Sequence, residues 1–196
     1  MTKKLMVGRV AVGGGAPVSI QSMCNTKTDD VDATVAQIRT LADAGCEIIR
    51  VAVPDEAAAM AVDRIKEQIS IPLIADIHFN YKLALMCAER GIDALRINPG
   101  NIGGEEKVRA VAEVCRLKNI PIRIGVNGGS LEKELRARYG GVTAEALVES
   151  AMGHVKLLNR YDFDDICISV KCSDVPLTMR AYTLLSQQTD YPLHLG

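Results

Sequence analysis

The chain has 196 residues, of which 48% are hydrophobic and 24% are charged, a composition typical of a soluble globular domain. Its net charge of −1 predicts no bulk attraction to nucleic acid or to an anionic membrane. Five Tyr, two Phe and no Trp also leave few platforms on which bases could stack. The N-terminus lacks the apolar segment of a secretion signal, and no stretch reaches the ~20 apolar residues that span a bilayer. The sequence therefore predicts a cytoplasmic protein.

The first predicted element is a plain hairpin over residues 7–17, which contain a strand and the turn Gly13-Gly14-Gly15. A phosphate-binding glycine loop is the alternative, but no helix follows it directly. Short β-rich runs then alternate with Ala-, Leu-, Glu- and Lys-rich stretches, which indicates parallel βαβ units. The predicted strands span residues 18–23, 48–53, 73–78, 94–98, 121–127, 166–171 and 193–195. The predicted helices span residues 31–44, 56–68, 81–90, 105–118, 144–160 and 177–187.

Three junctions between a helix and the next strand resemble one another. At residues 44–50, 90–96 and 118–123, a Gly or Asn that suits a left-handed helix end precedes a strand that carries an Arg. Equivalent strands favour a barrel over a doubly wound sheet. The predicted fold is therefore α/β: an incomplete (β/α)8 TIM-type barrel of about seven strands with a short N-terminal β-hairpin, forming one domain over residues 1–196.

Side chains alternate between the two faces of a strand. One face of nearly every predicted strand is aliphatic, and the other becomes polar towards the C-terminal end, where barrel enzymes have their active sites. The polar faces carry Arg50, Arg96, Asn98, Arg123, Asn127, Ser169 and Lys171. Any one of these cations could simply pair with a neighbouring acid. Together they face few acids, and because an unpaired buried charge is costly, the set predicts a site for an anion such as a diphosphate.

Other polar residues join this face. Asp76 and His78 lie two residues apart and are candidates for moving protons or for binding a hydroxyl. We find no third ligand at convincing spacing and predict no metal site. His194, at the end of the last strand, is a further candidate for substrate binding, whereas His154 is interpreted as a surface or packing residue of a helix.

Two glycine-rich loops, at residues 98–104 and 127–130, each precede a helix. They would let backbone N–H groups approach an anion, although plain turns have the same composition. The six cysteines contain no C-x-x-C pair, which favours buried thiols over metal ligands.

Several long segments resemble the 4-hydroxy-3-methylbut-2-en-1-yl diphosphate synthases. They are Val-Ser-Ile-Gln-Ser-Met (18–23), Ala-Asp-Ile-His-Phe (75–79), Leu-Arg-Ile-Asn-Pro-Gly-Asn-Ile-Gly (95–103), Ile-Arg-Ile-Gly-Val-Asn-Gly-Gly-Ser-Leu-Glu-Lys (122–133), Ser-Val-Lys-Cys-Ser-Asp (169–174) and Pro-Leu-His-Leu-Gly (192–196). They occur in order through nearly the whole chain. The resemblance implies a barrel that binds 2-C-methyl-D-erythritol 2,4-cyclodiphosphate and takes part in its reductive ring opening.

The resemblance also implies roles for individual residues. Strand-end basic residues of this family, which grip the diphosphate, match Arg50, Arg96, Arg123 and Lys171. Asp76, His78, Asn98 and Asn127 fall at its substrate-contact positions.

The family's cofactor and partners are implied in the same way. Its members take electrons from flavodoxin or ferredoxin through a [4Fe–4S] cluster, which a separate C-terminal domain holds, and they work as homodimers. The present chain stops before the eighth strand and that domain, and none of its cysteines matches a cluster ligand. We therefore expect the chain by itself to be inactive.

Two alternatives stay open beside the oxidoreductase. The chain could be a fragment that binds the cyclodiphosphate without turning it over. It could also be a phosphate-handling barrel transferase of the pterin-synthase type, which the motif strings disfavour.

Overall fold

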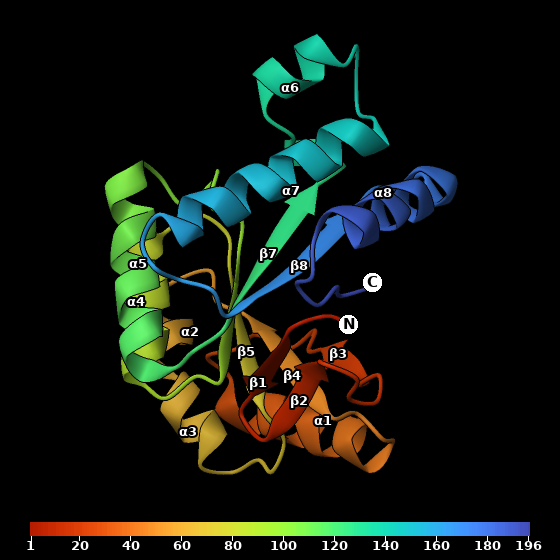
Figure 1. Ribbon diagram of the computed structural model, residues 1–196. Coiled ribbons are helices and arrows are strands. Elements are labelled where there is room, and N and C mark those ends of the chain that lie inside the picture. Colours follow the sequence, from red (N-terminus) through yellow and green to blue (C-terminus); the bar gives the residue numbers. More distant parts are fainter.

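The computed structural model describes residues 1–196 and contains a curved parallel sheet wrapped by helices (Figure 1). The six strands follow one another in the sheet in chain order, each hydrogen-bonded to the next, as in a TIM-type barrel. They are β3 (Gln21–Met23), β4 (Ile48–Ala52), β5 (Leu73–Ile77), β6 (Ala94–Ile97), β7 (Ile122–Asn127) and β8 (Ile166–Lys171). The predicted incomplete α/β barrel is confirmed.

The helices cover the outer face of this sheet. They are α1 (Val31–Asp43), α2 (Glu56–Met60), α3 (Val62–Lys66), α4 (Tyr81–Glu89), α5 (Glu105–Lys118), α6 (Lys133–Arg138), α7 (Ala144–Asn159) and α8 (Val175–Gln188). Several begin at a side chain that accepts a hydrogen bond from a free backbone N–H of the first turn. The capping residues are Asp30, Asp55, Asn80, Thr143 and Asp174. None of the helices is both long and apolar enough to cross a lipid bilayer.

Side-chain alternation along the strands holds throughout the barrel. On β7, Ile122, Ile124 and Val126 are buried beneath the helices, in the same core cluster as Leu147 of α7. Burying such β-branched side chains stabilises the fold by roughly 1.5–3 kcal/mol each. The opposite face of each strand is thereby left for the interior of the barrel, where the candidate site lies.

An antiparallel hairpin, β1 (Lys4–Val7) and β2 (Val10–Gly13), closes the N-terminal end of the barrel. Leu5 and Val7 pack on lumen-facing side chains from four strands, namely Ile48, Ile74, Ala94 and Cys167. Gly8 turns the hairpin with a positive φ of 54°, a conformation that glycine adopts without strain. The hairpin predicted at residues 7–17 is present, but it begins earlier, at Lys4.

Two sequence predictions need correction. The single helix predicted over residues 56–68 is divided into α2 and α3 at Ala61, a buried residue whose φ of −82° and ψ of −14° depart only modestly from helical values. The strand predicted at residues 193–195 is a single parallel bridge between Leu193 and Ile168. Residues 193–195 pair with β8 on one side, and no strand pairs with them on the other. The sheet therefore has six strands instead of seven.

Gly153 is an exposed residue in the middle of α7, and a Cβ added there would meet nothing within 4 Å. We expect Gly153→Ala to raise the free energy of unfolding by about 0.5–1 kcal/mol, because glycine loses more backbone freedom in a helix than alanine does. Urea denaturation would measure the change. A lower midpoint in the variant would contradict it.

Candidate anion-binding site in the barrel lumen

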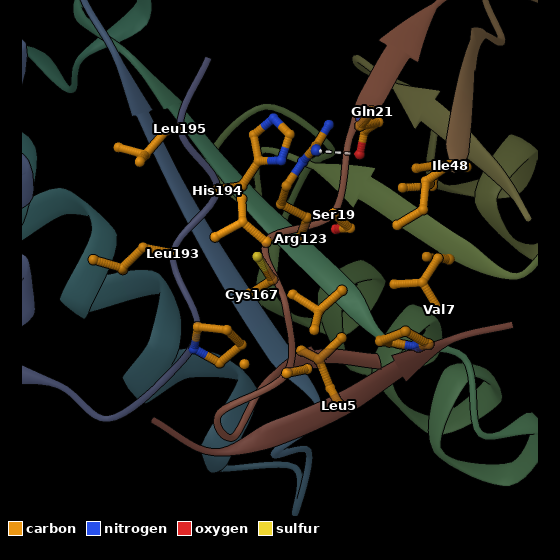
Figure 2. Close-up of a pocket in the computed structure, with 18 of the residues that line it drawn as sticks. Leu5, Val7, Ser19, Gln21, Ile48, Arg123, Cys167, Leu193, His194 and Leu195 are labelled. Atoms are coloured by element: carbon orange, nitrogen blue, oxygen red, sulfur yellow. Dashed lines mark hydrogen bonds between the residues drawn. The ribbon is translucent and has the colours of Figure 1, made fainter. Parts of the chain in front are cut away.

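A cavity of about 710 Å³ occupies the lumen between the hairpin and the ends of the strands (Figure 2). Its floor is apolar and includes Leu5, Val7 and Ile48, whereas Arg123, Gln21 and His194 line it higher up. A small molecule with an anionic end and a short carbon skeleton would find both environments in this space.

Asp76 does not line the cavity itself but is the buried carboxylate that contacts Arg50 in its wall. It is 3% exposed and accepts a hydrogen bond of 3.1 Å from Nη1 of Arg96. The guanidinium of Arg50 lies 3.6 Å from its other oxygen. Arg96 also donates to the carbonyl oxygen of Gly125 at 3.2 Å. One acid on β5 therefore holds two arginines, from β4 and β6, in fixed positions.

Arg123 has no such acid. Its Nη1 donates to Oε1 of Gln21 at 3.0 Å, while its Nε and Nη2 are buried without any hydrogen-bond partner. The residue is only 4% exposed, and burial together with the nearby charge of Arg50 lowers the pKa of its guanidinium to about 10. Buried N–H groups of a charged side chain are normally satisfied. The two free donors therefore point to an anion that binds beside Arg123.

Burial also lowers the pKa of Arg50, which donates to the thioether sulfur of Met23 at 2.8 and 3.1 Å. A thioether is a weak acceptor that carries no charge. Three guanidinium groups thus face one carboxylate, and the excess positive charge would stabilise a bound phosphate group by charge-assisted hydrogen bonds.

Of the remaining predicted residues, only His194 lines the cavity. His78 follows β5, with its Nε2 3.5 Å from Asp76 and 45% of its side chain exposed. Asn98 is buried directly after β6, and Asn127 ends β7. Ser169 uses its hydroxyl to donate to the carbonyl oxygen of Ile124.

Lys171 has the least contact with the cluster. It lies on the same face of β8 as Ser169 and next to Asn127 in register, but it is exposed and makes no ion pair with Asp76.

His194 lies beside Arg123 in the cavity wall (Figure 2). Burial, and then the charges of Arg123 and Arg50, lowers the pKa of its imidazole to about 4. The ring is therefore neutral at physiological pH. A neutral imidazole can donate one hydrogen bond to an anion without adding to the repulsion among the arginines.

We expect His194 to weaken the fold as the pH falls from 6.5 to about 4. In this window the unfolded chain protonates the imidazole and the folded chain does not, so the free energy of unfolding decreases with decreasing pH. His194→Gln should remove this part of the pH dependence. The measurement is thermal unfolding of both proteins at several pH values, and parallel curves across the window would contradict the expectation.

Sequence reasoning missed Gln21, Met23 and Gly125. Gln21 and Met23 occupy lumen-facing positions of the first barrel strand, so the alternation that identified the arginines would have found them. A Cβ on Gly125 would come within 2.2 Å of Nε of Arg96, which means that the missing side chain at this position makes room for the guanidinium. A glycine in a strand interior signals such a close approach.

The six cysteines lie on different elements, and no three His, Cys, Asp or Glu residues come together as metal ligands would. Burial raises the pKa of Cys24 and Cys167 to about 11 and that of Cys87 and Cys115 to about 12. Thiols with these pKa values are poor sources of thiolate for metals.

Comparison with known sequences gives a consistent result. The family model described as "GcpE TIM-barrel domain" matches residues 2–196. The 4-hydroxy-3-methylbut-2-en-1-yl diphosphate synthase (flavodoxin) of Geobacter sulfurreducens is 61% identical over 195 residues, covering all of this chain and 55% of the relative. The enzyme of that name from Ectopseudomonas mendocina is 59% identical over 196 residues, all of this chain and 53% of the relative. The chain thus spans about half the length of these relatives.

Solved structures with similar architecture have much lower sequence identity. The 3-dehydroquinate dehydratase of Geobacillus kaustophilus superposes with a TM-score of 0.72 at 13% identity, over 98% of this chain and 79% of that one. Dihydropteroate synthase of Yersinia pestis gives a TM-score of 0.67 at 11% identity, over 98% and 75%. At these identities the similarity shows the barrel fold alone.

Proposed function

Since this chain belongs to the GcpE TIM-barrel domain family, we propose that it is the substrate-binding barrel of a 4-hydroxy-3-methylbut-2-en-1-yl diphosphate synthase. Its substrate would be 2-C-methyl-D-erythritol 2,4-cyclodiphosphate. The observation that carries this proposal is the buried guanidinium of Arg123 with two free donors, beside a cavity large enough for a five-carbon diphosphate. The names of the relatives support the same reaction.

In this proposal the arginines bind the diphosphate and Asp76 orients them. Arg123 would donate its free N–H groups to phosphoryl oxygens, and Arg50 and Arg96 would add charge from the neighbouring strands. Each such contact contributes roughly 1.5–3 kcal/mol, so a few of them hold the ligand firmly. Lys171, Ser169 and His194 would complete the binding surface.

His78 is the candidate proton donor. Its Nε2 lies 3.5 Å from Asp76, and 45% of the side chain is exposed, so the ring can reach both the site and solvent. Ring opening with loss of a hydroxyl group requires a proton for the departing oxygen. The amides of Asn98 and Asn127 would hold the hydroxyl groups of the carbon skeleton.

The electrons of this reaction need a redox group, which we propose to be the family's [4Fe–4S] cluster. The cysteines of this chain do not fit that group, because no three of them come together as metal ligands, five of the six are buried, and burial raises the pKa of four of them. We propose that its ligands lie outside residues 1–196, and that the whole enzyme is a cytoplasmic homodimer reduced by flavodoxin or ferredoxin. No electron-transfer step is assigned to the residues described here.

Calorimetric titration of the full chain with the cyclodiphosphate tests the proposal. We expect saturable, exothermic binding that an equal concentration of a dihydropterin does not reproduce. The dihydropterin tests the alternative that the chain is a barrel transferase of the pterin-synthase type. Its similarity to dihydropteroate synthase concerns the fold alone. Binding of the pterin without binding of the cyclodiphosphate would overturn the proposal.

A further inference from the structure

His154 lies on α7, in the layer of helices outside the barrel, and contacts two segments at the mouth of the site. His154 is 8% exposed, and its Nε2 lies 3.1 Å from Oε1 of Glu132, close enough for an ion pair but without the geometry of a hydrogen bond, since Nε2 has no hydrogen-bond partner. On another side the ring lies against Gly100, where an added Cβ would be 3.3 Å from the Cε1 atom of His154. Glu132 belongs to the segment after β7, and Gly100 belongs to the loop after β6. One imidazole therefore touches the connections that follow two adjacent strands.

Glu132 is held on α7 by a second side chain as well. The hydroxyl of Ser150, one helical turn before His154, donates to the same carboxylate oxygen at 3.0 Å. The contact with His154 is the main cause that lowers the pKa of Glu132 to about 2. Glu132 is therefore ionised at every physiological pH, and the hydrogen bond from Ser150 joins the segment that carries it to α7.

Both fixed segments carry candidate substrate-binding amides. The backbone N–H of Gly100 donates to Oδ1 of Asn98 at 3.1 Å, so the position of Gly100 sets the orientation of that amide. In the other segment Arg136 donates to the carbonyl oxygen of Gly128, directly after Asn127. A shift of either segment would move the amide attached to it.

We propose that His154 is a positioning residue that clamps the loop after β6 to the segment after β7 and thereby sets Asn98 and Asn127 for ligand binding. The identity of the ligand rests on the proposed function, but the clamp does not. A simple packing role would be served as well by an apolar side chain, because burying a His–Glu pair costs desolvation that a hydrophobic residue of similar volume avoids. The presence of His154 and Glu132 at these positions is therefore better explained by a role in joining the two segments.

The test compares four variants of the full chain. His154→Leu and Glu132→Ala each break the clamp, and Glu132→Ala removes a partly exposed side chain, so it tests the clamp even if the buried substitution impairs folding. His154→Gln can place an amide nitrogen near the position of Nε2 and should restore the contact with Glu132. Val155→Ala is the control, since it makes a cavity in the same helix at a residue that is 3% exposed and that belongs to the core cluster.

Two measurements are made on each variant. The first is the dissociation constant of the cyclodiphosphate, which we expect to rise about tenfold, or about 1.4 kcal/mol, in His154→Leu and Glu132→Ala. His154→Gln should recover most of the affinity, and Val155→Ala should bind like the unmodified chain despite its lower stability. The second is the NMR signals of the Asn98 and Asn127 side-chain amides without ligand, which should shift in the two clamp variants.

The two measurements separate the possible failures. If the unmodified chain does not bind the cyclodiphosphate, the proposed function is wrong, and the amide signals still report on the clamp. If the amide signals of His154→Leu and Glu132→Ala match those of the unmodified chain, the clamp itself is overturned. Equal loss of affinity in Val155→Ala would also overturn it, because destabilisation alone would then account for the effect.

Discussion

Replacing Arg123 by methionine should have two opposite effects: the chain without ligand becomes more stable, and binding of the cyclodiphosphate becomes about 10- to 150-fold weaker. Both follow from the two N–H groups that are buried without partners. Leaving buried polar groups unsatisfied costs about 1–3 kcal/mol, which methionine, a flexible apolar residue, would recover. The same substitution removes the donors that we assign to the phosphoryl oxygens.

Thermal unfolding without ligand and calorimetry with the cyclodiphosphate measure the two effects on one preparation. Arg116→Met is a matched control, because Arg116 is exposed on α5 and a surface substitution changes stability by less than about 0.5 kcal/mol. Arg123→Lys should keep part of the affinity, since an ammonium keeps the charge but loses the planar fork. A lower midpoint for Arg123→Met, with unchanged affinity, would show that Arg123 supports the fold instead of a ligand.

Gly125→Ala should displace Arg96 and cost both stability and affinity. The added Cβ would lie 2.2 Å from Nε of Arg96 and 2.5 Å from its Nη2, distances that neither group can tolerate. The guanidinium would have to leave Asp76, which would then lose its closest positive partner. Overpacking of this kind typically costs 1–3 kcal/mol, and separating a buried ion pair adds to that cost, so we expect a loss of at least about 2 kcal/mol.

Urea denaturation and calorimetry measure the loss. Gly129→Ala is the control, because a Cβ at Gly129 meets nothing within 4 Å and this glycine has no positive φ. The control should unfold within about 0.5 kcal/mol of the unmodified chain. Equal stability and affinity in Gly125→Ala and Gly129→Ala would contradict the expectation. The guanidinium of Arg96 could then adopt another position, and neither stability nor binding would depend on its contact with Asp76.

Strand alternation allowed much of the site to be predicted from the sequence. It placed Arg50, Asp76, Arg96 and Arg123 on lumen-facing positions, and the structure brings these residues together. The prediction succeeds because the period of a strand is fixed by its backbone and does not depend on what lies around it. Helix ends could be predicted for a similar reason, since α5 spans the predicted residues 105–118 and ends at Asn119 in a left-handed conformation.

The missed features depend on contacts between distant segments. The break at Ala61 could not be predicted, because no glycine or proline marks it in the sequence. Lys171 lies on the predicted face of β8. Strand alternation predicts the face of a residue but not its distance from other residues, and Lys171 is exposed at the end of the strand, away from the buried arginines. The contacts of His154 with Glu132 and Gly100 could not be predicted either, because no sequence pattern links residues so far apart in the chain.

The hairpin at the base of the barrel also sets an order of events during protein synthesis. Its residues leave the ribosome well before their docking surface, which is complete only when Cys167 of β8 has been made. At about 5–20 residues per second, this leaves Leu5 and Val7 without their final partners for about 8 to 30 seconds. A hairpin forms within microseconds but is only marginally stable alone, so its apolar side chains stay exposed until their partners are made. Until β8 is made, this exposed apolar face is a site at which the nascent chain can aggregate.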